Sequence, residues 1–256
     1  MATMIHAHRG ASSLLPENTL EAFSLAVEQK ADFIELDVHL TKDGHIVVAH
    51  DSTLERVSNG SGYINDQTLE ELRDLDFGKL FPKDDGSPAV FRIPLLSEVF
   101  SLVKPTELSV NIELKTTERL YPELPKMLVA LAKEYSMEER IIYSSFNHYS
   151  LAELRKIEGR AKTGLLYELG MVDPWVYANY CGAYAIHPYF YVIAALPETV
   201  KHCHDNGVKV NVWTVDNEDA VKLMLKCGVD GIITNKPGAA VTFRNEFIKG
   251  EEHAGK

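Results

Sequence analysis

The amino-acid sequence predicts an α/β protein built as a parallel (β/α)8 TIM barrel with one small insertion. Strand and helix signals alternate along the chain, and eight strands, each followed by helical material, fit within 256 residues. Charged and aromatic residues recur where these strands end, which is where such barrels carry their active groups. No Gly-x-Gly-x-x-Gly pattern follows the first strand, which disfavours the alternative of a doubly wound open sheet.

Short apolar runs indicate the strands, and apolar residues at helical spacing indicate the helices. The eight predicted strands cover 4–8, 33–40, 108–115, 140–145, 162–167, 184–187, 208–213 and 231–234. Helices are predicted at 20–27, 96–103, 122–134, 151–157, 174–180, 197–206 and 218–226, with another after the last strand. Asn18 and Glu21 have the spacing of a capping box at the start of the first helix.

A short hairpin and a long insertion follow the second strand. Asp43-Gly44 is a strong turn signal, and Ile46-Val47-Val48 after it indicates a returning strand that brings His50-Asp51 back towards the second strand. From about 52 to 92 the alternation stops, and this stretch is too long for an ordinary connection. We therefore expect residues 1–256 to form a single domain, in which the insertion packs over one end of the barrel as a lid or as a solvated decoration.

The composition predicts a globular protein that binds neither nucleic acid nor membrane. Hydrophobic residues make up 45% and charged residues 25% of the chain, and the net charge of −11 disfavours anionic partners. No stretch approaches the roughly twenty apolar residues needed to span a bilayer, and the N-terminus lacks a signal-peptide pattern. Cys181, Cys203 and Cys227 lack metal-ligand spacing, so we expect reduced thiols and a cytoplasmic protein.

Acidic residues gather on one face of two predicted strands. Glu35 and Asp37 share a face of the second strand because successive side chains alternate, and Glu113 and Lys115 share a face of the third. If the two strands are neighbours, three carboxylates converge, and such a cluster requires protons or a cation. All-oxygen ligands suit one hard divalent ion, Mg²⁺ or Ca²⁺, with Mn²⁺ as a further option. The alternative, a salt-bridge network with Arg9 and Lys115, leaves one negative charge unmatched.

Two histidines and two cations at predicted strand ends complete the chemistry of phosphodiester cleavage. That reaction needs charge neutralisation on the non-bridging oxygens, a base for the nucleophile and an acid for the leaving group. Arg9 offers bidentate contact with a phosphate, and Lys115 offers a point charge. His8 and His50, with an ordinary pKa near 6.5, suit the roles of acid and base, and which of them plays which role stays open.

Further candidates rest on position alone. Phe146 and Trp213 follow the fourth and seventh strands and could wall a pocket against the carbons of a substrate, or belong to the core. His39 and His187 are weaker candidates. The other six histidines are expected at the surface.

The order of these motifs resembles one enzyme family over nearly the whole chain. The motifs are His8-Arg9-Gly10, Pro16-Glu17-Asn18-Thr19, Glu35-Leu36-Asp37-Val38, His50-Asp51 and Ile112-Glu113-Leu114-Lys115. In this order, with these gaps, they look like the glycerophosphodiester phosphodiesterase family. The resemblance implies a barrel that cleaves glycerophosphodiesters to glycerol 3-phosphate and an alcohol. It also implies metal ligands at Glu35, Asp37 and Glu113 and an acid/base pair at His8 and His50. Asn235 departs from the pattern, because the family often carries an acid there.

Several alternatives stay open from the sequence. The leading substrates are small molecules such as glycerophosphocholine or glycerophosphoethanolamine. A lysophospholipase D acting on acylated glycerophospholipids would need an apolar mouth, which Tyr63, Phe77, Leu80 and Phe81 could supply. A catalytically silent barrel that binds phosphate esters is the non-enzyme alternative. A Schiff-base aldolase using Lys115 is disfavoured, because neighbouring acids raise the pKa of its ammonium group. Water or the substrate's own 2-hydroxyl could attack phosphorus, and the oligomeric state, with a homodimer as one option, is not fixed by the sequence.

Overall fold

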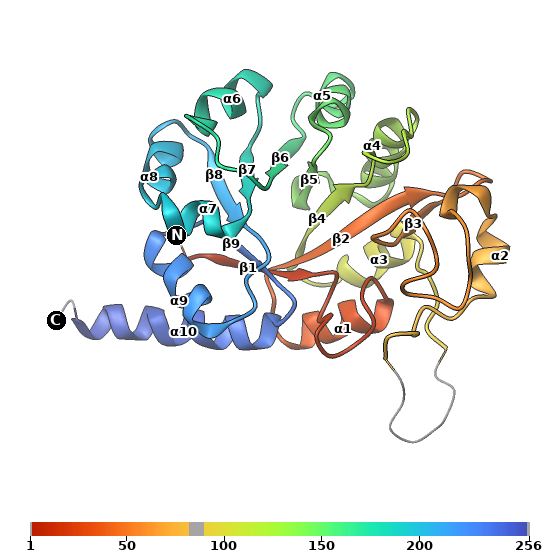
Figure 1. Ribbon diagram of the computed structural model, residues 1–256, viewed down its shortest axis with the longest axis horizontal. Coiled ribbons are helices and arrows are strands. Elements are labelled where there is room, and N and C mark those ends of the chain that lie inside the picture. Colours follow the sequence, from red (N-terminus) through yellow and green to blue (C-terminus); the bar gives the residue numbers. More distant parts are fainter. Residues whose placement is uncertain (1, 82–89, 255–256) are drawn as a thin grey trace.

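A computed structural model of the chain confirms the predicted barrel of parallel strands (Figure 1). It describes residues 2–81 and 90–254, with side chains as far as residue 250. Within these residues the eight barrel strands are β1 (Met4–His8), β2 (Phe33–Leu40), β4 (Ser109–Leu114), β5 (Ile141–Ser145), β6 (Lys162–Tyr167), β7 (Ala185–Pro188), β8 (Lys209–Val212) and β9 (Gly231–Thr234). They run in the order β1-β9-β8-β7-β6-β5-β4-β2, and pairing of β2 with β1 closes the barrel.

Helices surround the strands and pack an apolar face against them (Figure 1). They are α1 (Leu20–Glu28), α2 (Leu69–Arg73), α3 (Leu96–Val103), α4 (Leu124–Tyr135), α5 (His148–Ile157), α6 (Pro174–Cys181), α7 (Phe190–Ala195), α8 (Glu198–Asp205), α9 (Glu218–Cys227) and α10 (Pro237–Ala254), with 3-10 turns at Ile64–Asp66 and Glu138–Arg140. The sequence does not predict α7, whose short apolar run has no polar face. In the described part of the chain, none of the helices has both the length and the apolar character of a membrane span.

Alternation along β2 and β4 decides which side chains face the barrel interior, and the register between the two strands decides which of them are neighbours. Ile34, Leu36 and Val38 are fully buried in the core between strands and helices. The alternate residues of β2 therefore point inward, and Asp37 pairs in register with Glu113. The predicted neighbour relation between the two acidic strands is correct.

The insertion forms a small hydrophobic cluster of its own beside β3 (Ile46–Val48), which pairs antiparallel with β2. Its α2 begins with a capping box, in which Thr68 and Glu71 exchange hydrogen bonds. Phe77 is only 6% exposed, so the prediction that it contributes to an apolar mouth is wrong. Residues 82–89 of the predicted insertion lie outside the described residues. The buried members of the cluster are Val47, Ala49, Leu54, Val57, Ile64, Leu72, Phe77 and Ile93.

A layer of neutral polar side chains, here called the imidazole layer, lies inside the barrel and consists of His6, His187 and Asn211. His6 is 1% exposed and stacks on Phe33 with ring centroids 4.2 Å apart, so its predicted place at the surface is wrong. Asn211 Nδ2 lies 2.9 Å from Nε2 of the fully buried His187. A Cβ on Gly164 would lie 2.3 Å from that Nε2, so only glycine leaves room for the ring.

Candidate active site

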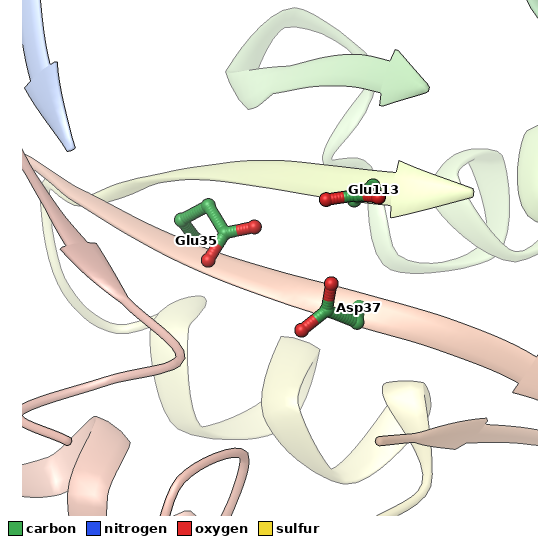
Figure 2. Close-up of side chains that lie close together, drawn as sticks. All are labelled: Glu35, Asp37 and Glu113. Atoms are coloured by element: carbon green, nitrogen blue, oxygen red, sulfur yellow. The ribbon is translucent and has the colours of Figure 1, made fainter. Parts of the chain in front are cut away.

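Three buried carboxylates meet at the end of β2 and β4 (Figure 2). Glu35, Asp37 and Glu113 are 3%, 1% and 9% exposed. Each offers an oxygen within 4.8 Å of the other two, and Figure 2 shows the three carboxylate groups turned towards the same space. The pairing of β2 with β4 produces this cluster because all three residues have the inward parity of their strands.

The surrounding charges shift the pKa values of Asp37 and Glu35 in opposite directions. Burial alone would raise the pKa of Asp37, yet Arg9, His50 and Lys115 hold it well below its ordinary value. Burial and the neighbouring acids raise the pKa of Glu35 well above its ordinary value. Asp37 Oδ1 is buried and, among the described residues, has no hydrogen-bond partner. The site thus holds an ionised carboxylate, one oxygen of which accepts no hydrogen bond and lies 3.8 Å from Lys115 Nζ.

A left-handed turn after β1 brings Arg9 over the carboxylates. Arg9 and Gly10 have φ angles of 56° and 85°, and a Cβ on Gly10 would lie 2.7 Å from the Ala22 carbonyl carbon. The Arg9 backbone N–H donates to Glu35 Oε2 at 3.0 Å, and Arg9 Nε lies 3.4 Å from Asp37 Oδ2. The turn therefore binds one acid through the backbone and another through the side chain.

Asn18 has a different role from the predicted one. Thr19, not Asn18, caps α1, because the Thr19 hydroxyl accepts from the Ala22 N–H. Asn18 instead adopts a left-handed φ of 58° and donates from Nδ2 to Asp37 Oδ2 at 2.9 Å. It holds the Asp37 carboxylate through Oδ2 and leaves Oδ1 without a hydrogen bond, 3.8 Å from Lys115 Nζ.

Asn235, which follows the last strand, holds the His8 ring in one orientation. Its Nδ1 lies 2.7 Å from Asn235 Oδ1, and Asn235 Nδ2 donates to Asp216 Oδ2 at 2.6 Å. Because the amide nitrogen serves Asp216, the amide oxygen must accept from His8, so neutral His8 carries its proton on Nδ1. Burial and the nearby Arg9 lower the pKa of His8 to about 4. The unprotonated Nε2 lies 4.0 Å from Glu35.

His50 lies on the opposite side of the cluster, carried there by β3. Its Nδ1 is 2.6 Å from Asp51 Oδ1, and its Nε2 is 3.1 Å from Lys115 Nζ. Hydrogen bonding to His50, together with Arg56, holds the pKa of Asp51 well below its ordinary value. Lys115 also donates to Glu113 Oε1 at 2.8 Å. One hydrogen-bonded network therefore connects the side chains of Glu113, Lys115, His50, Asp51 and Arg56.

Phe146 and Trp213 meet edge to face with ring centroids 5.4 Å apart. They line a cavity of about 80 Å³, here called the axial pocket, together with His8, His50 and Lys115. The structure therefore brings all nine predicted site residues to one place. Their roles stay predictions.

The two weaker histidine candidates lie away from the axial pocket. His187 belongs to the imidazole layer, where burial lowers its pKa to about 3. His39 Nδ1 lies 3.1 Å from the Tyr121 hydroxyl, and its Nε2 lies 3.1 Å from the His50 carbonyl oxygen. Since a carbonyl only accepts, His39 donates to it and supports the backbone that carries His50.

Sequence reasoning missed the residues that support the predicted ones. Glu17 accepts from Arg9 at 3.0 Å and from Arg56 of the insertion at 2.7 Å, and Arg56 in turn pairs with Asp51. Asp216 follows β8, so its place after a barrel strand is a signal that could have found it. Arg56 lies in a stretch without periodic pattern and offers no such signal.

Comparison with known proteins agrees with this geometry. The sequence profile of the Glycerophosphoryl diester phosphodiesterase family matches residues 8–239. A glycerophosphodiester phosphodiesterase of Caldanaerobacter subterraneus subsp. tengcongensis is 49% identical over 237 residues, which is 93% of this chain and 96% of that protein.

Solved structures show the same architecture. An Oleispira antarctica phosphodiesterase in complex with the product sn-glycerol-3-phosphate has a TM-score of 0.87 and 26% identity, covering 95% of this chain and 97% of that one. A glycerophosphodiester phosphodiesterase of Thermotoga maritima has a TM-score of 0.76 and 29% identity, covering 94% and 98%. With a family match over most of its length and a relative at 49% identity, this chain belongs to the glycerophosphoryl diester phosphodiesterase family and is an enzyme of that family.

Proposed function

We propose that this protein hydrolyses small glycerophosphodiesters, such as glycerophosphocholine or glycerophosphoethanolamine, to glycerol 3-phosphate and an alcohol. The observation that carries the proposal is the buried carboxylate trio flanked by His8 on one side and His50 on the other. The Oleispira relative, bound to sn-glycerol-3-phosphate, adds support from outside the chain.

Glu35, Asp37 and Glu113 would hold one divalent cation, Mg²⁺ or Ca²⁺, with Mn²⁺ as a further option. Their all-oxygen donor set and Asp37 Oδ1, which accepts no hydrogen bond, fit a hard cation. When bound, the cation supplies positive charge for the non-bridging oxygens of the phosphate. Arg9 and Lys115 contribute further charge. Burial would lower the pKa of Lys115, but Asp37 and Glu113 raise it above its ordinary value, which keeps the ammonium charged and unsuited to Schiff-base chemistry.

The hydrogen bonds of His8 favour it as the base, and we therefore assign the role of acid to His50. His8 donates from Nδ1 to Asn235, so its Nε2 lone pair is free to take the proton of the attacking hydroxyl, whether of water or of the glycerol 2-position. His50 has the Asp51 carboxylate at Nδ1 and accepts a hydrogen bond from the Lys115 ammonium at Nε2. As the acid it would carry a proton on Nε2 in place of this contact and give that proton to the leaving alkoxide. Phe146 and Trp213 would contact the glycerol carbons.

A leaving group that needs no proton tests this division of roles. On the choline ester we expect His50→Ala to lower kcat by about a thousandfold. On a p-nitrophenyl ester of glycerol phosphate its loss should fall below about tenfold, because p-nitrophenolate leaves unprotonated. His8→Ala should be impaired on both esters. Equal losses for His50→Ala on the two esters would contradict the assignment.

A divalent-ion titration tests the function itself. Hydrolysis of deacylated phospholipid head groups should vanish in chelator, return with the cation and be absent in Glu113→Ala. Full activity after removal of divalent ions would refute metal dependence. Comparing acylated with deacylated glycerophosphocholine tests the lysophospholipase D alternative, for which the burial of Phe77 removes one of the four supporting residues.

A cytoplasmic location is also part of the proposal. It is supported by Cys181, Cys203 and Cys227, all of which are free thiols.

A further inference from the structure

A second and larger cavity adjoins the axial pocket on the far side of His50. Its volume is about 320 Å³, against about 80 Å³ for the axial pocket. It lies between the start of the insertion and the loop after β4, and the two cavities share only His50 and Lys115. A phosphate held at His50 and Lys115 would therefore have room on either side, and we call the larger space the insertion pocket.

If His50 is the acid, as proposed above, the insertion pocket lies on the side of the leaving group. His50, the proposed acid, lines both cavities, whereas His8, the proposed base, lines only the axial pocket. The acid must contact the oxygen of the departing alcohol. On that assignment the departing alcohol would extend from His50 into the insertion pocket, with the glycerol beside Phe146 and Trp213.

The charged groups of the insertion pocket leave one negative charge unmatched. Lys115 is paired with Glu113, and Asp51 is paired with Arg56. The exposed Glu118 accepts a hydrogen bond from the buried Ser52 hydroxyl, which fixes it at the wall. Within the part of the chain that the structure describes, no cation lies within 4 Å of the Glu118 carboxylate.

An aromatic ring at the wall of the insertion pocket is already in contact with a cation of the protein. Tyr63 lines the insertion pocket, and the guanidinium carbon of Arg119, which does not line it, lies 4.0 Å from the centroid of the Tyr63 ring. Because the Arg119 guanidinium already covers one face of this ring, the ring adds no further attraction, and recognition of a cationic head depends on the Glu118 carboxylate.

We infer that the insertion pocket is the subsite for the alcohol half of the substrate, and that Glu118 selects an amino alcohol with a cationic head over a neutral alcohol of the same shape. The inference rests on the proposed function and specifies its substrate class. Because Glu118 is exposed, its charge is partly screened, and the expected preference is about fivefold.

Two esters that differ only in charge test the inference. They are glycerophosphocholine and the glycerol phosphate ester of 3,3-dimethylbutanol, in which carbon replaces the ammonium nitrogen. For the wild type we expect kcat/KM to favour choline by about fivefold, through KM, and the preference to shrink with added salt. Free choline should also inhibit better than free 3,3-dimethylbutanol.

Glu118→Gln is the matching variant, because glutamine keeps an acceptor for Ser52 and loses only the charge. We expect its choline preference to fall below about twofold. Glu107→Gln changes the net charge equally at an exposed site outside the pocket and should keep the wild-type preference.

The outcomes separate the two hypotheses. Equal kcat/KM for both esters in the wild type, or a preference that survives in Glu118→Gln, overturns the subsite and leaves the proposed function intact. A wild type that hydrolyses neither ester refutes the proposed function and the subsite together.

Discussion

The barrel interior holds two layers of polar side chains, of which one is charged and the other neutral. At the mouth, Glu35, Asp37 and Glu113 are buried beside Arg9 and Lys115 and form a charged cluster. In the imidazole layer, burial lowers the pKa of His6 and His187 to about 3, so both rings stay neutral. A buried polar group without a charged partner is most stable when neutral, whereas a buried charge persists only where other charges or a ligand compensate it.

His6 and His8 show this difference within one strand. They lie two residues apart and share the inward parity of β1, yet His6 is covered by Phe33 and His8 faces the axial pocket. The comparison therefore separates stability from catalysis: changes in the imidazole layer should affect folding, and changes at the mouth should affect turnover.

The largest contrast is expected between two histidine substitutions. His8→Gln should lower kcat by about a hundredfold to ten-thousandfold while changing the free energy of unfolding by less than about 1 kcal/mol. His187→Gln should keep kcat within about threefold and lower the free energy of unfolding by about 1–3 kcal/mol. Steady-state kinetics and urea unfolding on both variants measure the contrast. If His187→Gln were the less active of the two folded proteins, the comparison would fail.

Substitutions of Asn235 and Asn211, the amides that contact His8 and His187, should show the same contrast between activity and stability, with smaller effects. Asn235→Ala removes the acceptor for His8 Nδ1 and should lower kcat by about tenfold through loss of the required tautomer. Asn211→Ala removes the partner of His187 Nε2 and should cost about 1–3 kcal/mol of stability with kcat little changed. The same two assays apply. A loss of stability in Asn235→Ala with unchanged kcat would show that Asn235 serves the fold alone.

A further effect, which is absent above pH 6.5, is a change in the pH dependence of stability. The pKa of His187 is about 3 in the folded protein and 6.5 without burial. Below the higher value the unfolded chain binds a proton that the folded chain does not, so this contribution to stability is present above pH 6.5 and is lost as pH falls towards 3. His187→Gln should therefore lessen the slope of stability by about 1.4 kcal/mol per pH unit below that value.

Urea unfolding at several pH values measures this slope, and His202→Gln at an exposed position serves as the control. The control should keep the wild-type slope. An unchanged slope in His187→Gln would mean that this imidazole titrates equally in the folded and unfolded chains.

The fold and the acidic cluster at the mouth both follow from local patterns in the sequence. The barrel follows from local patterns, because alternation along β2 and β4 specifies both the core face and the polar face. The same alternation places Glu35, Asp37 and Glu113 together, and the turn at Asp43-Gly44 returns His50. Neither result needs knowledge of distant contacts beyond the pairing of consecutive barrel strands.

The supporting contacts could not be predicted, because they join segments that meet only when the barrel closes. His8 and Asn235 lie 227 positions apart, and Arg56 reaches Glu17 from within the insertion. Asn18 was misassigned as a cap because its left-handed backbone turns the side chain towards Asp37. The surface position predicted for His6 is wrong because His6 and His8 share one face of a five-residue strand, and the sequence does not reveal how far that face is covered.

Calorimetric titration of the metal-free protein with Mg²⁺, Ca²⁺ or Mn²⁺ tests the central claim most directly. The account predicts one bound divalent ion in the wild type and in His187→Gln, and none in Asp37→Asn or Glu113→Ala. Unchanged binding in the two carboxylate variants, or hydrolysis of glycerophosphodiesters by a wild type that binds no divalent ion, would contradict it.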